Sequence, residues 1–127
     1  MEPIGEQIVE VPEDALRAEA RDTRMGYIAY VPPGSIGRGK EVAATYQCSV
    51  CHGASLEGLG PAPPLAGRSP SYTARQLFDM KVMTRRGPWA EMMKPIVEKL
   101  SLADMLAVSA YAASLAPPAS RAVRGTR

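Results

Sequence analysis

The sequence predicts an all-α domain of three to five short helices, and three observations support this fold class. Apolar residues recur at helical spacing in two segments, residues 70–83 and 102–115. Each segment follows a serine that suits a helix N-cap, Ser69 and Ser101. The β-prone stretches are confined to the first 34 of the 127 residues. A chain of this length is sufficient for one domain with a single core.

Residues 1–34 are predicted to form an N-terminal extension. Two short β-prone segments, residues 8–12 and 27–31, flank a charged segment, residues 13–24, that favours a short helix. A Pro-Pro-Gly sequence at residues 32–34 ends the extension. We expect the extension to pack across the domain and cover apolar surface. The alternative is an arm that docks a partner protein.

The predicted domain occupies residues 35–118, and its first helix runs from Ser35, as N-cap, to Gln47. Gly39 lies inside this helix, where glycine is costly, so we expect another helix to approach closely there. The second helix starts with Pro70 and ends near residue 83, and a helical turn is expected near residues 89–93.

The last helix has the clearest start and end signals. Ser101-Leu102-Ala103-Asp104 is a variant of the capping box, and two prolines at residues 117 and 118 end the apolar pattern. Residues 119–127 are predicted to form a basic, frayed C-terminal tail.

The most informative motif combines both cysteines and the only histidine of the chain. Cys48, Cys51 and His52 form a Cys-x-x-Cys-His run, which is typical of covalent attachment of one haem c. The two thiols would form thioethers with the haem vinyl groups, and His52 would coordinate the iron.

Three other interpretations of this motif fit the sequence less well. A structural zinc site usually needs four ligands, and the chain has two cysteines and one histidine in total. A thioredoxin-like redox pair requires a βαβ pattern beside the cysteines, whereas the flanking segments are helical and turn-rich. A simple disulfide leaves the adjacent His52 unexplained.

Composition and charge restrict the function further. Only 6% of the residues are aromatic, so an apolar macrocycle would supply much of the core volume. The net charge is +2, and no basic stripe with interleaved aromatic residues indicates nucleic-acid binding. No apolar run has transmembrane length. Thioether attachment implies export in bacteria, so we expect a periplasmic protein whose leader was removed, although the acidic start shows no apolar leader segment.

The sixth iron ligand cannot be a second histidine of this chain, which leaves methionine, lysine, tyrosine, water or none. Met92 and Met93 lie in the irregular stretch between the second and last helices, where a loop can place a side chain over the iron. Core filling or surface exposure is expected for the other methionines, which are Met1, Met25, Met80, Met83 and Met105.

The order of these parts resembles a class I c-type cytochrome, of the single-haem bacterial His/Met branch. The resemblance covers residues 35–116 and rests on the Gly39 helix, the Cys-x-x-Cys-His-Gly motif, Pro-Pro-Leu-Ala-Gly at residues 63–67, a methionine, and a last helix with Tyr111. It implies the cytochrome c fold around one covalent haem and a contact between Gly39 and Tyr111.

The resemblance also implies the remaining site residues. In the family the ligand methionine precedes the Leu-Ser of the last helix by seven residues, which gives Met93, and a shift of one residue would give Met92. The carbonyl that orients the proximal histidine maps onto Pro63, with Pro64 as the alternative.

These features favour a soluble electron-transfer protein over an enzyme, because the only histidine is spent on iron and no catalytic residue is expected. The expected partners are redox proteins, and we expect a monomer. The first alternative is an electron-transfer subunit docked on a dehydrogenase or terminal oxidase. The second is a gas-binding or peroxidase-like haem protein with an open iron site.

Overall fold

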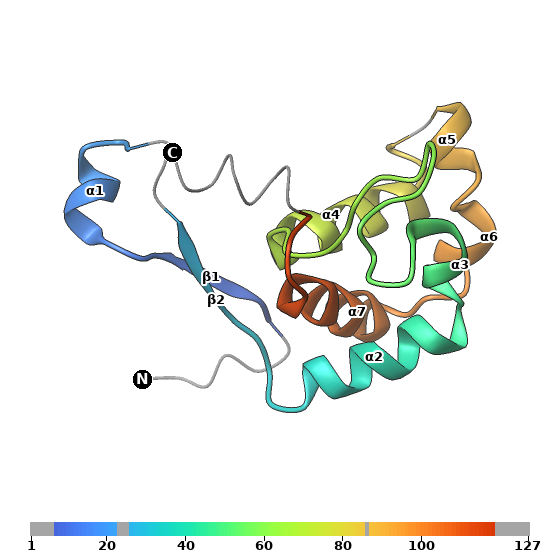
Figure 1. Cartoon of the computed structure of the whole chain (residues 1–127), viewed down its shortest axis with the longest axis horizontal. Coiled ribbons are helices and arrows are strands. Elements are labelled where there is room, and N and C mark those ends of the chain that lie inside the picture. Colours follow the sequence, from blue (N-terminus) through green and yellow to red (C-terminus); the bar gives the residue numbers. More distant parts are fainter. Residues whose placement is uncertain (1–6, 23–25, 86, 119–127) are drawn as a thin grey trace.

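A computed structural model describes residues 7–22, 26–85 and 87–118 (Figure 1). The described part of residues 35–118 contains six helices, which confirms the all-α class with one helix more than the upper expectation. They are α2 (Ser35–Thr45), α3 (Cys48–His52), α4 (Pro70–Lys81), α5 (Pro88–Glu91), α6 (Lys94–Val97) and α7 (Leu102–Ser114). The predicted basic tail, residues 119–127, lies outside the described residues.

The core is formed where α2 and α4 pack against α7. Its buried side chains come from these three helices and from the segment around α6; they are Val42, Ala43, Leu77, Val97, Leu100, Met105 and Val108. Gly39 permits the close approach of α2 and α7: a Cβ at this position would overlap the carbonyl oxygen of Ala107 and lie 2.7 Å from the Cβ of Tyr111. The expected contact between Gly39 and Tyr111 is therefore present.

The starts of the helices follow the sequence signals with one exception. Ser69 is the N-cap of α4, and its hydroxyl accepts a hydrogen bond from the Tyr72 N–H at 3.1 Å, as predicted. Ser35 is not the N-cap of α2, which is Gly34 with a φ of +84°. The Ser35 hydroxyl instead donates to the carbonyl oxygen of Pro32 at 2.6 Å, so it stabilises the turn before the helix.

The capping box of α7 is complete. The Ser101 hydroxyl accepts from the Asp104 N–H at 3.0 Å, and the Asp104 carboxylate accepts from the Ser101 N–H at 3.2 Å. Partial burial alone would raise the pKa of Asp104, but these hydrogen bonds and the Arg38 guanidinium at 3.3 Å outweigh it and lower the pKa. The charged carboxylate therefore stabilises the folded state.

We expect Asp104→Ala to lower the free energy of unfolding at neutral pH by roughly 1 kcal/mol, the usual cost of a lost helix cap. Because the folded pKa is depressed, the contribution of the charged carboxylate is complete above the unfolded pKa of about 3.9 and disappears as the pH falls through the folded pKa. Denaturation at neutral and at acidic pH should show that the difference in free energy of unfolding between the parent protein and the variant becomes smaller in acid. The control is Glu98→Ala, which removes an exposed carboxylate. A difference that persists undiminished in acid would contradict this assignment.

The loop of residues 53–69 is fixed to the domain through its backbone. The carbonyl oxygen of Leu56 accepts from the N–H groups of Leu65 and Ala66 at 2.8 and 3.0 Å, and the Gly67 N–H donates to the carbonyl of Ala112 in α7 at 2.9 Å. The Leu56 side chain is buried although its φ is +55°, so packing holds the backbone in a conformation that leucine rarely adopts. These contacts position the prolines at residues 63 and 64.

The extension forms an antiparallel ribbon of β1 (Val9–Pro12) and β2 (Tyr27–Tyr30), with α1 (Ala15–Glu19) between them. Opposed residues in the two strands are Val9 and Tyr30, Glu10 and Ala29, Val11 and Ile28, and Pro12 and Tyr27.

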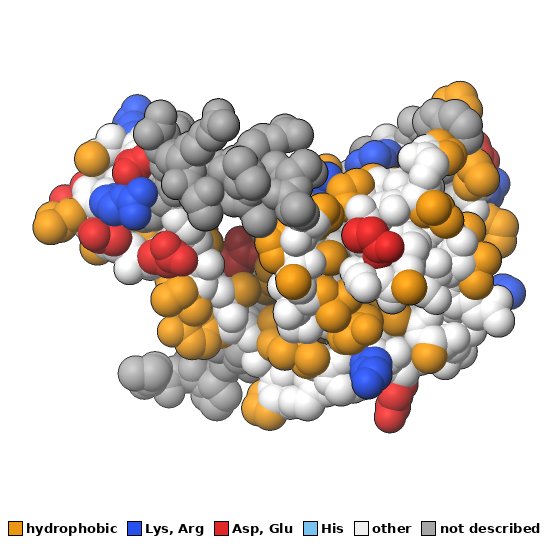
Figure 2. Space-filling view, in the orientation of Figure 1, with side chains coloured by type: hydrophobic (Ala, Val, Ile, Leu, Met, Phe, Trp, Pro, Cys, Tyr) orange, Lys and Arg blue, Asp and Glu red, His pale blue; other side chains and the backbone are white. Residues whose placement is uncertain are grey.

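The extension covers less of the domain than expected. All four residues of β2 are exposed and α1 buries none of its residues, so neither element covers much apolar surface of the domain. Figure 2 shows the hollow that remains between the ribbon and the domain. No helix in the described ranges is both long and apolar enough to cross a bilayer.

Candidate haem site

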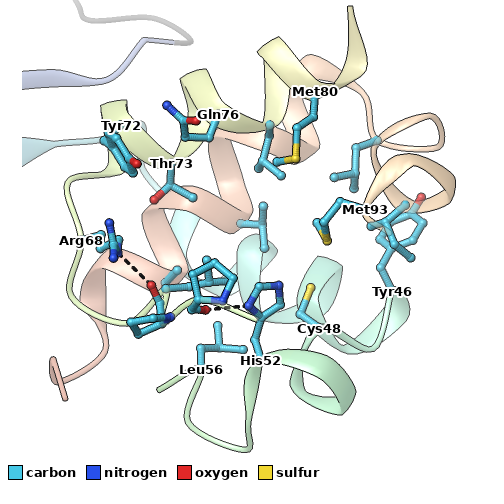
Figure 3. Close-up of a pocket in the computed structure, with 18 of the residues that line it drawn as sticks. Tyr46, Cys48, His52, Leu56, Arg68, Tyr72, Thr73, Gln76, Met80 and Met93 are labelled. Carbon is cyan, nitrogen blue, oxygen red and sulfur yellow. Dashed lines mark hydrogen bonds between the residues drawn. The ribbon is translucent and has the colours of Figure 1, made fainter. Parts of the chain in front are cut away.

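A mainly apolar cavity is lined by residues of the six helices α2 to α7 and of the 53–69 loop (Figure 3). Its volume is about 210 Å³, more than ten times what one ordered water requires. The aliphatic side chains that line it are Val42, Leu56, Leu65, Leu77, Ala90, Ile96, Leu100, Val108 and Ala112. A cavity of this kind suits a large apolar group with a few oriented polar contacts.

His52, at the end of α3, is 6% exposed and lines the cavity. Its Nδ1 lies 2.8 Å from the carbonyl oxygen of Pro63, which acts as the acceptor for an Nδ1–H. This is the contact that the resemblance implied for Pro63; the Pro64 carbonyl instead accepts from the Arg68 Nε at 2.8 Å. With Nδ1 protonated and held, Nε2 carries the lone pair that can coordinate a metal.

The two cysteines lie one turn apart on α3 in different surroundings. Cys48 lines the cavity and is half-buried, and burial raises the pKa of its thiol. Cys51 is exposed and is not among the residues that line the cavity. The two cysteines are not joined in a disulfide.

The other interpretations of the motif gain no support from this geometry. The described residues contain no group of three or more His, Cys, Asp or Glu side chains that could hold a metal ion, so they offer no zinc ligand set. The one described sheet lies in the extension and is not part of a βαβ unit around the cysteines.

The methionines differ in whether their side chains line the cavity. Met93, at the N-cap of α6, lines the cavity, and Figure 3 shows its side chain and the His52 ring directed into the same space. Met92 is 63% exposed and does not line the cavity. Met80 packs on the core, as expected, but it also lines the cavity from α4, which the sequence reasoning did not foresee.

The sequence did not reveal a group of polar residues on one side of the cavity. Arg68, Tyr72, Thr73, Gln76 and Arg85 line it beside the aliphatic residues. The Arg68 guanidinium lies 5.6 Å from the Tyr72 ring centroid, and Arg85 donates a hydrogen bond to Gln76 Oε1. The signal that could have found two of them is the i, i+4 spacing of Tyr72 and Gln76, which places both on one side of α4, with Arg68 just before the helix.

The model of the family described as Cytochrome c matches residues 36–116. The chain belongs to the cytochrome c family. This cytochrome is 32% identical over 82 residues to cytochrome c-554(548) of Halomonas halodenitrificans, a match that covers 64% of this chain and 96% of that protein. Cytochromes of this family hold haem c covalently.

Longer relatives match the same region. The cytochrome is 36% identical over 77 residues to a thiosulfate dehydrogenase electron acceptor of Stutzerimonas stutzeri, which covers 59% of this chain and 34% of that protein. The solved cytochrome c4 of Pseudomonas stutzeri superposes with a TM-score of 0.59 at 28% identity, covering 68% of this chain and 51% of that one. The cytochrome thus spans about a third to a half of the length of these two relatives.

The residues of the cavity fit a haem. Its aliphatic walls suit the macrocycle, the free Nε2 of His52 suits the iron, and the arginines and Tyr72 supply donors for the two carboxylates that a haem carries. The exposed Cys51 suits attachment at an edge that solvent reaches, with Cys48 on the inner side.

Proposed function

We propose that this chain is a monohaem c-type cytochrome that transfers single electrons between redox proteins. In this proposal Cys48 and Cys51 would carry the two thioethers, and His52 and Met93 would coordinate the iron. The observation that carries it is the placement of His52, oriented by the Pro63 carbonyl, and Met93 on one apolar cavity. The bound haem would supply a one-electron couple at its iron.

The side chains of the cavity would favour electron transfer over chemistry at the iron. A thioether is a soft ligand that stabilises the reduced iron and raises the reduction potential. Leu77, Ile96 and Leu100, which line the cavity together with Met93, would limit the access of water to the iron. No histidine remains for general acid–base catalysis, since His52 is the only one.

Mass spectrometry of the denatured, purified protein should show one added haem per chain that acidified acetone cannot extract. Two thioethers survive unfolding, whereas a haem held by axial ligands alone would be lost. Cys51→Ala should leave one thioether and shift the absorption bands of the reduced protein. Bound zinc without haem, or haem that is fully extractable, would contradict the proposal.

A second candidate role is that of a docked electron-transfer subunit. Two observations favour it: the similarity to a thiosulfate dehydrogenase electron acceptor, and the exposed apolar side chains of β2, among them Tyr27, Ile28 and Tyr30. We place both roles in the bacterial periplasm, where c-type haem is attached. Removal of residues 1–34 distinguishes them: a free carrier still exchanges electrons with protein partners, whereas a subunit loses its association with the dehydrogenase.

A further inference from the structure

The ribbon of the extension meets the haem-binding domain across a groove. Residues from both parts line it: Glu10, Tyr27, Ala29 and Val31 from the extension, and Ile36, Arg68, Ser69 and Pro70 among others from the domain. In the ribbon, Glu10 lies opposite Ala29, so its side chain is on the face that turns toward the domain. Figure 2 shows this groove as the hollow between the two parts.

Glu10 binds the start of α4 across this groove. Its Oε1 accepts a hydrogen bond from the Ser69 hydroxyl at 2.5 Å and another from the Ser71 N–H at 3.2 Å. Ser69 in turn accepts from the Tyr72 N–H. A carboxylate is favourable at this position, because the free N–H groups of a 12-residue helix carry partial positive charge there.

The segment that Glu10 holds is the one that orients the proximal histidine. Arg68 directly precedes the cap, and its Nε donates to the carbonyl of Pro64 at 2.8 Å while its guanidinium lies over the Tyr72 ring. The neighbouring Pro63 carbonyl accepts from His52. Five residues therefore lie between Pro63, whose carbonyl accepts from His52, and Ser69, which donates to Glu10, and hydrogen bonds fix the backbone between them.

We propose that Glu10 is a positioning residue for the haem site: through Ser69 and Ser71 it fixes residues 63–72, and with them the orientation of His52 and the α4 wall of the cavity. The extension is then part of the haem site although none of its described residues lines the cavity. This inference rests on the proposed function, because it assigns His52 to the iron.

Three variants of the haem-loaded protein test the proposal. Glu10→Ala removes both hydrogen bonds and the charge, Glu10→Gln removes the charge but keeps an acceptor, and Glu19→Ala removes an exposed carboxylate from α1 as the matched control. The readouts are the reduction potential, at low and high salt, and the exchange rate of the Ser71 amide hydrogen.

Glu10→Ala should raise the reduction potential, since a looser Pro63 contact makes the imidazole a weaker donor to ferric iron. The Ser71 amide should exchange roughly tenfold faster, as expected for the loss of a capping contact. Loss of a negative charge would also raise the potential, but salt screens this effect. At high salt, Glu10→Gln should therefore match the parent protein and Glu10→Ala should not, while Glu19→Ala should match it throughout.

A purely stabilising Glu10 would lower the melting temperature of Glu10→Ala without moving the potential, and this result would overturn the inference. The same holds if Glu10→Ala and Glu10→Gln shift the potential equally at high salt, because charge alone would then explain it. Protein without covalent haem would overturn the proposed function as well. If Glu10→Ala carries haem and its reduction potential is unchanged, the inference about Glu10 is overturned and the proposed function is not.

Discussion

Replacing Met93 by alanine is expected to remove the weak far-red absorption band of the ferric protein, which arises from an iron–thioether bond. The reduction potential should fall by on the order of 100 mV, because a thioether stabilises ferrous iron and its replacement by water does not. The vacated position should also let the reduced variant bind carbon monoxide rapidly, whereas the parent protein should bind it poorly at neutral pH. Absorption spectra and redox titration measure all three effects.

Two other methionines provide the controls for Met93. Met92→Ala should leave the band and the potential unchanged, since this side chain is largely exposed and lies off the cavity. Met80→Leu should keep the band as well, although it alters the α4 wall. If Met92→Ala or Met80→Leu alone abolished the band, the ligand would be assigned to that residue and not to Met93. Rapid binding of carbon monoxide by the parent would favour the open-site class.

Gly39→Val is expected to destabilise the folded protein by about 1–3 kcal/mol, the usual cost of overpacking a tight contact. A side chain at this position meets the backbone carbonyl of Ala107, which cannot rotate away, so α2 must move off α7. Chemical denaturation, followed by helical circular dichroism, measures the loss. Gly39→Ala should also be destabilising, because the overlap involves the Cβ itself.

Gly37 is a matched control on the same helix. Nothing lies within 4 Å of a Cβ placed at this position, so Gly37→Val changes the intrinsic helix preference without any steric overlap. Equal stability of the Gly37→Val and Gly39→Val proteins would show that the contact between the helices does not limit the side chain at residue 39.

Signals that act over a few residues were predicted well from the sequence. The caps of α4 and α7 depend on atoms three residues away, and the Cys-x-x-Cys-His motif is a local pattern. Ser35 was assigned wrongly because the left-handed Gly34 can take the cap position without a side-chain oxygen. The four-residue helix α6 was not predicted, since it is too short to show a period and contains Pro95.

Features that join distant parts of the chain were not predictable from spacing. The hydrogen bond from Ser69 to Glu10 spans 59 residues, and nothing in a charged β-prone segment marks one carboxylate as a cap for a remote helix. Helical periodicity assigned Met80 to the core, and only the arrangement of α4 relative to α6 shows that the same side chain reaches the cavity.

The Glu10 carboxylate is held at α4 by a ribbon whose two strands depend on the connection between them. Strands of four residues, paired only with each other, have little stability of their own in water. The covalent connection through α1 keeps β1 near β2. The two strands therefore pair at a high effective concentration, although their affinity for each other is low. A single protease cut in the exposed stretch of residues 13–17 would therefore let β1 diffuse away. The Glu10 carboxylate would then be lost from the start of α4, although no residue that lines the cavity is changed.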